Sequence, residues 1–96
     1  MRELKIEIYG SVQGVGFRSF VKRNADELGI GGYVRNSDDG SVLVIAQSNR
    51  DELEKFLSVV RQGPISVRVE RVLYEWKDSD KNYDSFDIRL NNSIKV

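Results

Sequence analysis

The 96-residue chain contains neither cysteine nor histidine. Without cysteine it forms no disulfide and offers no thiolate to a metal or a substrate. Without histidine it lacks the commonest general base and the commonest metal ligand of proteins. Thiol nucleophiles, histidine-based acid–base catalysis and zinc sites built on these side chains are therefore excluded.

The chain also lacks net charge and long apolar runs. Its 15 basic and 15 acidic residues cancel, so no overall field attracts it to nucleic acid or to an anionic membrane. No apolar segment approaches the roughly 20 residues that span a bilayer, and residues 1–5 lack the apolar core of a signal peptide. We expect a cytoplasmic protein without a nucleic-acid or membrane partner, folded as a single domain over residues 1–96.

The first half of the chain alternates between strand and helix patterns. Alternating apolar residues from Leu4 to Ile8 predict a strand that Gly10 ends. From Phe17 the apolar residues recur at helical spacing until Gly29, which predicts a helix over this stretch. Two short extended runs on either side of residues 37–40, which have turn chemistry, predict a hairpin.

The second half adds a helix and further extended runs. Asn49 and the glutamate three residues later have the spacing of a capping box, and the helical pattern that follows ends at Gly63. A strand is predicted over residues 67–76, with a bulge near Arg71 where the alternation slips by one. The last strand is formed by this run, by residues 86–90, or by both. The order β-α-β-β-α-β predicts an α+β, ferredoxin-like sandwich with two helices on one face of an antiparallel sheet.

Residues 10–18, between the first strand and the first helix, form a glycine-rich loop that ends in an arginine. Its three glycines allow successive backbone N–H groups to turn toward one point. The helix start adds unpaired N–H donors, and Arg18 supplies a full positive charge where the helix dipole favours an acid. This segment predicts a local anion site. The simpler interpretation is a tight turn followed by a solvated arginine.

The loop does not match the common nucleotide-binding motifs. A Walker A motif requires Gly-Lys-Ser/Thr where this chain has Gly16-Phe17-Arg18. The dinucleotide-binding fingerprint requires a third glycine where Ser19 stands. ATP and NAD are therefore not the expected ligands.

Two segments closely resemble the signature segments of the acylphosphatase family. The first is Gly10-x-Val12-Gln13-Gly14-Val15-x-Phe17-Arg18, and the second is Gly32-Tyr33-Val34-Arg35-Asn36-x-x-x-Gly40-x-Val42. The resemblance continues to residues 86–89 and covers most of the chain. One departure is Ser48, which stands where the family usually has a glycine, at the end of the hairpin away from the expected site.

The resemblance implies hydrolysis of acyl phosphates to a carboxylate and inorganic phosphate, without a metal or a cofactor. It implies two catalytic residues: Arg18 falls on the phosphate-binding arginine, and Asn36 on the asparagine that orients the attacking water. The phosphate-binding loop corresponds to the backbone of Ser11, Val12, Gln13, Gly14, Val15, Gly16, Phe17 and Arg18. The side chains of Ser11 and Gln13 are expected to face solvent or to brace the loop.

The expected partners are a small acyl phosphate as substrate and inorganic phosphate as product and inhibitor, and we expect a monomer. Acetyl, carbamoyl, glyceroyl and aspartyl phosphates share the reacting group, so the sequence leaves the acyl group open.

Other functions fit the same fold or loop. An RNA-binding module is one, although Arg18 and Ser19 stand where the RNA-binding octet requires a small residue and an aromatic. An accessory module that binds an acyl phosphate within a larger assembly is another, and a phosphate sensor without turnover is a third. Asn36 favours the enzyme, because simple anion binding has no need of a water-orienting amide.

Overall fold

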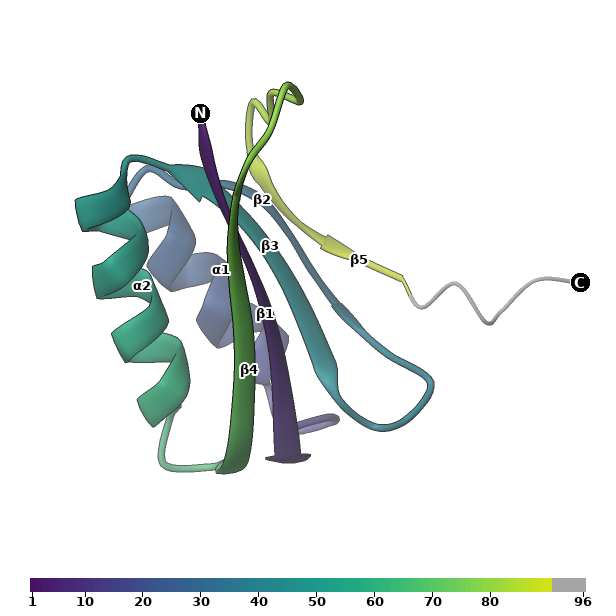
Figure 1. The fold of residues 1–96 in the computed structure, drawn as a ribbon. Coiled ribbons are helices and arrows are strands. Elements are labelled where there is room, and N and C mark those ends of the chain that lie inside the picture. The colour runs from purple at the N-terminus through teal and green to yellow at the C-terminus, as the bar shows by residue number, and fades with distance from the viewer. Residues whose placement is uncertain (91–96) are drawn as a thin grey trace, which may run out of the picture.

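The computed structural model describes residues 1–90, and its elements follow the order that the sequence predicts. The first strand, β1, covers Arg2–Ser11, and the others are α1 (Phe17–Glu27), β2 (Gly31–Asn36), β3 (Val42–Ser48), α2 (Arg50–Gln62), β4 (Arg68–Asp78) and β5 (Phe86–Arg89). Both helices lie on the same face of the sheet (Figure 1). The predicted ferredoxin-like sandwich is confirmed.

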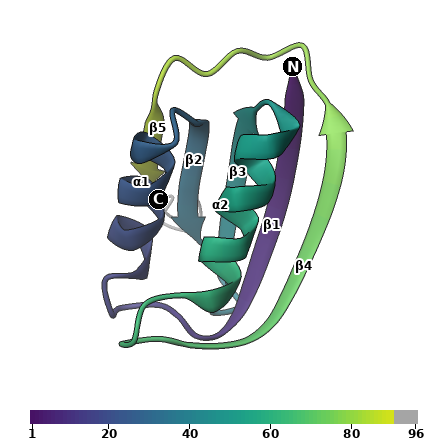
Figure 2. The ribbon, with the colours of Figure 1, turned by 90° about the vertical axis from the view of Figure 1, so that its left-hand side faces the viewer.

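The strands are arranged in the order β4-β1-β3-β2-β5. Strand β1 pairs antiparallel with β3 and β4, and β3 pairs antiparallel with β2. Strand β5 differs, because it pairs with β2 in the parallel direction, with Ile88 beside Val34. Figure 2 shows the segment between β4 and β5 crossing above the sheet from one edge to the other. The predicted antiparallel arrangement thus holds for four strands, and the fifth adds a parallel edge.

The hydrophobic core lies between the sheet and the helices. The strand residues Leu4, Ile6 and Ile8 are fully buried, as their alternation predicts. The helices contribute buried side chains at their own spacing: Phe17, Val21, Ala25, Leu53, Phe56, Leu57 and Val60. Each of the larger side chains, Ala25 excepted, contributes about 1.5–3 kcal/mol when it leaves water. Burial of one face of each element therefore sets the relative positions of the sheet and the helices.

The predicted end of β1 at Gly10 is wrong by one residue, because the strand continues to Ser11. The register of β1 against β4 shifts after Tyr9, which leaves Glu70 as an extra residue in β4. This bulge is the irregularity that the sequence predicts where the alternation of apolar residues slips by one. A Cβ atom at Gly10 would overlap the carbonyl oxygen of Arg68. Glycine at this position therefore lets β4 stay paired with β1 up to the start of the loop.

The two helices begin in different ways. In α2 the side chain of Asn49 accepts a hydrogen bond from the backbone N–H of Glu52 at 2.9 Å, which confirms the predicted cap. In α1 the capping residue is Gly16, which offers no side-chain acceptor. Of the helices in residues 1–90, none is long and apolar enough to cross a membrane.

We expect Asn49→Ala to lower the free energy of unfolding by about 1 kcal/mol, because one N–H at the start of α2 loses its acceptor. Urea denaturation followed by circular dichroism measures this change. Asn49→Asp is the matched control, because it keeps the acceptor oxygen and should stay within about 0.5 kcal/mol of the native protein. Equal losses in the two variants would contradict the capping role.

Candidate active site

The loop between β1 and α1 encloses a hollow of about 250 Å³. Gly14 and Gly16 have φ angles of 76° and 80°, a left-handed conformation that glycine adopts without the steric cost of a Cβ atom. The hollow is lined by Val12, Gly14, Gly16, Phe17, Arg18, Ser19 and Ile88. The last of these comes from β5, and the sequence analysis did not include it in the site.

The predicted loop residues differ in what they present to this hollow. Ser11 is the exposed last residue of β1. Val12 and Phe17 are each only 1% exposed, so their side chains belong to the core and anchor both ends of the loop. Val15 is 41% exposed, and its carbonyl oxygen accepts a hydrogen bond from the hydroxyl of Ser66 at 3.3 Å. The loop thus offers a ligand mainly its backbone.

Arg18 is the second residue of α1 and is partly buried. Within residues 1–90 its guanidinium has no ion pair. The first turn of α1 contains no acidic residue, whereas the first turn of α2 contains Asp51 and Glu52. The positive end of α1 and the charge of Arg18 therefore lie at one hollow without a compensating acid. Such an arrangement favours a bound anion.

Asn36 is the last residue of β2 and is partly buried. Its Oδ1 atom is buried and has no hydrogen-bond partner in the part of the chain that the structure describes. A buried amide oxygen without a donor is costly, so such an atom fits a water or ligand that donates to it. Asn36 does not line the hollow that Arg18 lines. A third residue connects the turn that follows Asn36 to the loop that precedes Arg18.

That third residue is Gln13, in the middle of the loop. Its Nε2 donates to the carbonyl oxygens of Ser37 at 2.9 Å and Ser41 at 2.7 Å. Both acceptors belong to the β2–β3 turn that directly follows Asn36, at the same end of the sheet as the loop (Figure 1). One amide thus fastens the loop to this turn, so of the two alternatives expected for the Gln13 side chain, facing solvent or bracing the loop, the hydrogen bonds show the second. We refer to this pair of hydrogen bonds as the Gln13 brace.

The β2–β3 turn is itself held by Asp39. The Oδ1 atom of this residue accepts hydrogen bonds from the hydroxyl of Ser41 at 2.6 Å and from its backbone N–H at 3.0 Å. These bonds, the hydroxyl first, hold the pKa of Asp39 below its ordinary value of 3.8. The carboxylate therefore stays ionised at neutral pH and stabilises the turn. Residues 1–90 contain no group of three acidic side chains placed to hold a metal ion.

Comparisons with known proteins show the family of the chain. Residues 4–88 match the family model described as Acylphosphatase. The acylphosphatase of Archaeoglobus fulgidus is 47% identical over 88 residues, which are 92% of this chain and 98% of that protein. The acylphosphatase of Thermotoga maritima is 44% identical over 89 residues, which are 93% of this chain and 98% of that protein. The crystal structure of acylphosphatase from Bacillus subtilis superposes with a TM-score of 0.89 at 34% identity, covering 93% of this chain and 99% of that one.

The family match and the superposition define a small α+β hydrolase with a ferredoxin-like fold. More narrowly, the chain belongs to the acylphosphatase family. The resemblance of its two signature segments is thereby confirmed. The one departure, Ser48, pairs with Arg2 at the end of β3 remote from the turn, so it lies away from the hollow.

Proposed function

We propose that the protein cleaves acyl phosphates with Arg18 and the backbone of residues 11–18 binding the phosphoryl group and Asn36 orienting the attacking water. Membership of the family supports acyl phosphate hydrolysis. The observation that carries the residue assignment is the guanidinium of Arg18, which has no ion pair among residues 1–90 and lies in a glycine-lined hollow at a helix start without acids. A guanidinium and backbone N–H groups are donors, so this set binds anions rather than cations.

Arg18 and the loop act on the phosphoryl group. The planar guanidinium binds two phosphate oxygens at once, and the N–H groups of the loop bind the others. These donors are already in place, so they stabilise the charge that develops in the transition state without reorganising. Each donor of this kind contributes about 2.7–4 kcal/mol in comparable sites. The anchoring of Val12 and Phe17 in the core keeps the loop in this shape.

Asn36 acts on the water. Its buried Oδ1 lacks a donor among residues 1–90, and a water that donates to it is held in one orientation. An amide has no basicity, so the proton of the water passes to a phosphoryl oxygen of the substrate. The water oxygen forms a bond to phosphorus, and the bond from phosphorus to the acyl oxygen breaks. The carboxylate that leaves is already a weak base, so no strong acid is required.

The RNA-binding alternative loses its basis in the structure. Residues 16–21 superficially match the aromatic octet, but Gly16 caps α1 and residues 17–21 form its first turns rather than a strand. A strand is needed to present aromatic side chains to bases in that type of module. The accessory-module and sensor alternatives are tested by turnover itself.

The test is hydrolysis of benzoyl phosphate by the purified protein in the presence of EDTA, with p-nitrophenyl phosphate as the matched phosphate ester. We expect rapid hydrolysis of the anhydride, competitive inhibition by inorganic phosphate, and no hydrolysis of the ester, whose leaving group is poorer. Binding of phosphate without any turnover of benzoyl phosphate would overturn the proposal in favour of a sensor or an accessory module.

We expect Gln13→Ala to lower kcat/KM for benzoyl phosphate by about 10-fold to 100-fold, because the loop and the turn that carries Asn36 are no longer held together. Steady-state kinetics measure this change. Gln62→Ala, at the exposed end of α2, is the matched control and should retain native kinetics. Native kinetics in a folded Gln13→Ala protein would show that the brace does not position the site.

A further inference from the structure

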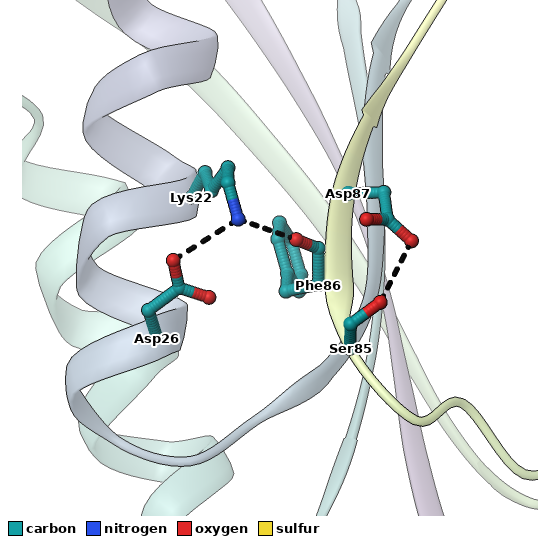
Figure 3. Close-up of polar contacts among 5 residues, drawn as sticks. All are labelled: Lys22, Asp26, Ser85, Phe86 and Asp87. Carbon is teal, nitrogen blue, oxygen red and sulfur yellow. Dashed lines mark hydrogen bonds and ion pairs between the residues drawn. The ribbon is translucent and has the colours of Figure 1, made fainter.

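Strand β4 forms one edge of the sheet, and its outer side has no partner strand within residues 1–90 (Figure 2). Such an edge presents N–H and C=O groups to any strand that comes alongside. The opposite edge strand, β5, has only 4 residues, whereas β4 has 11. In β5 the carbonyl oxygen of Phe86 also accepts a hydrogen bond from Nζ of Lys22 at 2.8 Å (Figure 3). Of the two edges, β4 is therefore the one with room for another strand.

The middle of β4 exposes large apolar side chains on both faces of the sheet. Leu73 is 43% exposed and Tyr74 is 49% exposed. Val72 and Trp76 pack against the core, so Tyr74 shares their face, and Leu73 lies on the face that the helices leave open. A strand that pairs with β4 covers both exposed side chains, which favours pairing. The chain has no net charge, so two copies of it do not repel each other as whole molecules.

Two charged side chains of β4 lack an ion partner among residues 1–90. The other charged residues of this strand are paired, at distances of 3.6–3.9 Å, in Arg68–Glu70, Lys77–Glu3 and Asp78–Arg2. The exposed Arg71 has its guanidinium 4.8 Å from the ring of Tyr9 and no carboxylate within 4.0 Å. The exposed Glu75 stands opposite Lys5 of β1 but forms no ion pair with it. Arg71 and Glu75 are thus free to pair outside their own chain.

A second copy of β4 can supply both missing partners. Two copies pair antiparallel about a two-fold axis perpendicular to the sheet, which keeps the open face of one beside the open face of the other. Such an axis passes through a single residue. With the axis at Leu73, Arg71 of each copy lies opposite Glu75 of the other, so the two unpaired charges are matched twice. On the other face, Tyr74 of each copy lies opposite Val72 of the other.

Other positions of the axis match the charges less well. An axis at Val72 pairs neither charge, and an axis at Tyr74 brings Arg71 opposite Lys77, a like charge. An axis at Glu75 brings two carboxylates face to face. An axis one residue further along pairs Glu75 with Lys77, but this lysine already has an ion partner in its own chain, and the exposed leucine falls outside the ladder. The side chains of β4 therefore favour one register.

We propose that the chain forms a dimer with a second copy of itself, in which the two β4 strands pair antiparallel about Leu73 and join the two sheets. The sequence analysis expects a monomer, because charged side chains on an edge strand usually oppose pairing. Here the two charges without partners are self-complementary instead. Arg18 lines its hollow with residues of the loop, of α1 and of β5, at the opposite edge of the sheet, so both active sites stay open in the dimer.

The first experiment is sedimentation velocity of the native protein over about a hundredfold range of concentration, in which we expect a reversible equilibrium between monomer and dimer. Arg71→Glu turns both ion pairs into repulsions and should raise the dissociation constant about tenfold or more. Glu75→Arg should do the same. Arg23→Glu is the matched control, because it makes the same change in charge at an exposed position of α1 and should keep the native dissociation constant.

Mixing the two weakened variants tests the register itself. In an equal mixture of Arg71→Glu and Glu75→Arg, both ion pairs again join opposite charges, so the dissociation constant should return to within about threefold of the native value. The matched control is a mixture of Arg23→Glu and Glu75→Arg, which has the same opposite net charges without the complementary pairs. It should stay as weak as Glu75→Arg alone.

Leu73→Lys covers the case in which a change at Arg71 or Glu75 disturbs the strand. The residue is exposed, and the substitution brings two ammonium groups face to face at the axis, so the dimer should be lost while circular dichroism stays native. A native protein that remains a monomer at every concentration would overturn the inference and leave the expected monomer. A dimer of native affinity in Leu73→Lys or in Arg71→Glu would also overturn it, because the interface would then lie elsewhere.

Discussion

Arg18→Gln is expected to weaken phosphate binding and turnover together. Glutamine keeps donor atoms but lacks the positive charge and the planar guanidinium that binds two oxygens at once. We therefore expect kcat/KM for benzoyl phosphate to fall by about 1,000-fold and the inhibition constant of phosphate to rise by about 100-fold. Both effects are measured in one set of inhibition experiments. Loss of a group that binds the ground state and the transition state alike affects both quantities.

Arg23→Gln is the matched control for this substitution. Arg23 lies on the same helix, is exposed, and has its guanidinium 5.8 Å from the ring of Phe20 rather than in the hollow. It should keep native kinetics. Arg18→Lys should recover only part of the activity, because an ammonium group does not reproduce the planar fork. Native phosphate affinity in Arg18→Gln would remove Arg18 from the anion site.

Asn36→Ala should separate binding from turnover. We expect kcat to fall by about 100-fold to 1,000-fold, because the water is no longer held in line with the breaking bond. The inhibition constant of phosphate should stay within about twofold, since the loop and Arg18 are intact. Asn82→Ala, in the exposed segment before β5, is the control for loss of an asparagine side chain. Equal loss of phosphate affinity and turnover in Asn36→Ala would contradict this division of roles.

The same variant also has an informative effect on stability. The Oδ1 atom of Asn36 is buried without a partner among residues 1–90, so its removal breaks no hydrogen bond within this part of the chain. We expect the free energy of unfolding of Asn36→Ala to equal or exceed that of the native protein. A less active but equally stable variant is typical of a residue retained for function.

Local patterns predict most of the elements of this fold. The alternation around Ile6 and the helical spacing around Val21 and Phe56 each select one buried face, and the structure buries those faces. The cap at Asn49 is also predicted from a local pattern, because its hydrogen bond joins residues three apart in sequence.

The features that the sequence does not predict depend on contacts between distant residues. Ser11 belongs to β1 because the bulge at Glu70 keeps β4 alongside, and that pairing joins segments far apart in the chain. The alternation of Phe86 and Ile88 is the same in a parallel and an antiparallel strand, so it does not predict the parallel pairing with β2. Without that pairing, nothing in the sequence places Ile88 beside the loop. The motif predicts the residues of the loop, but no pattern in the sequence predicts that a residue of β5 lines the same hollow.

The Gln13 brace has a consequence for behaviour at high ionic strength. Its donor is a neutral amide and its acceptors are backbone carbonyls, so dissolved salt does not screen it. Attraction between Arg18 and a phosphate is screened, with a Debye length of about 8 Å at physiological ionic strength and about 3 Å in 1 M salt. Added salt should therefore weaken capture of the substrate, while the bound substrate still meets a correctly placed water. A rising KM at nearly constant kcat would be the signature of a site in which an uncharged amide joins the loop to the turn and one positive charge attracts the substrate.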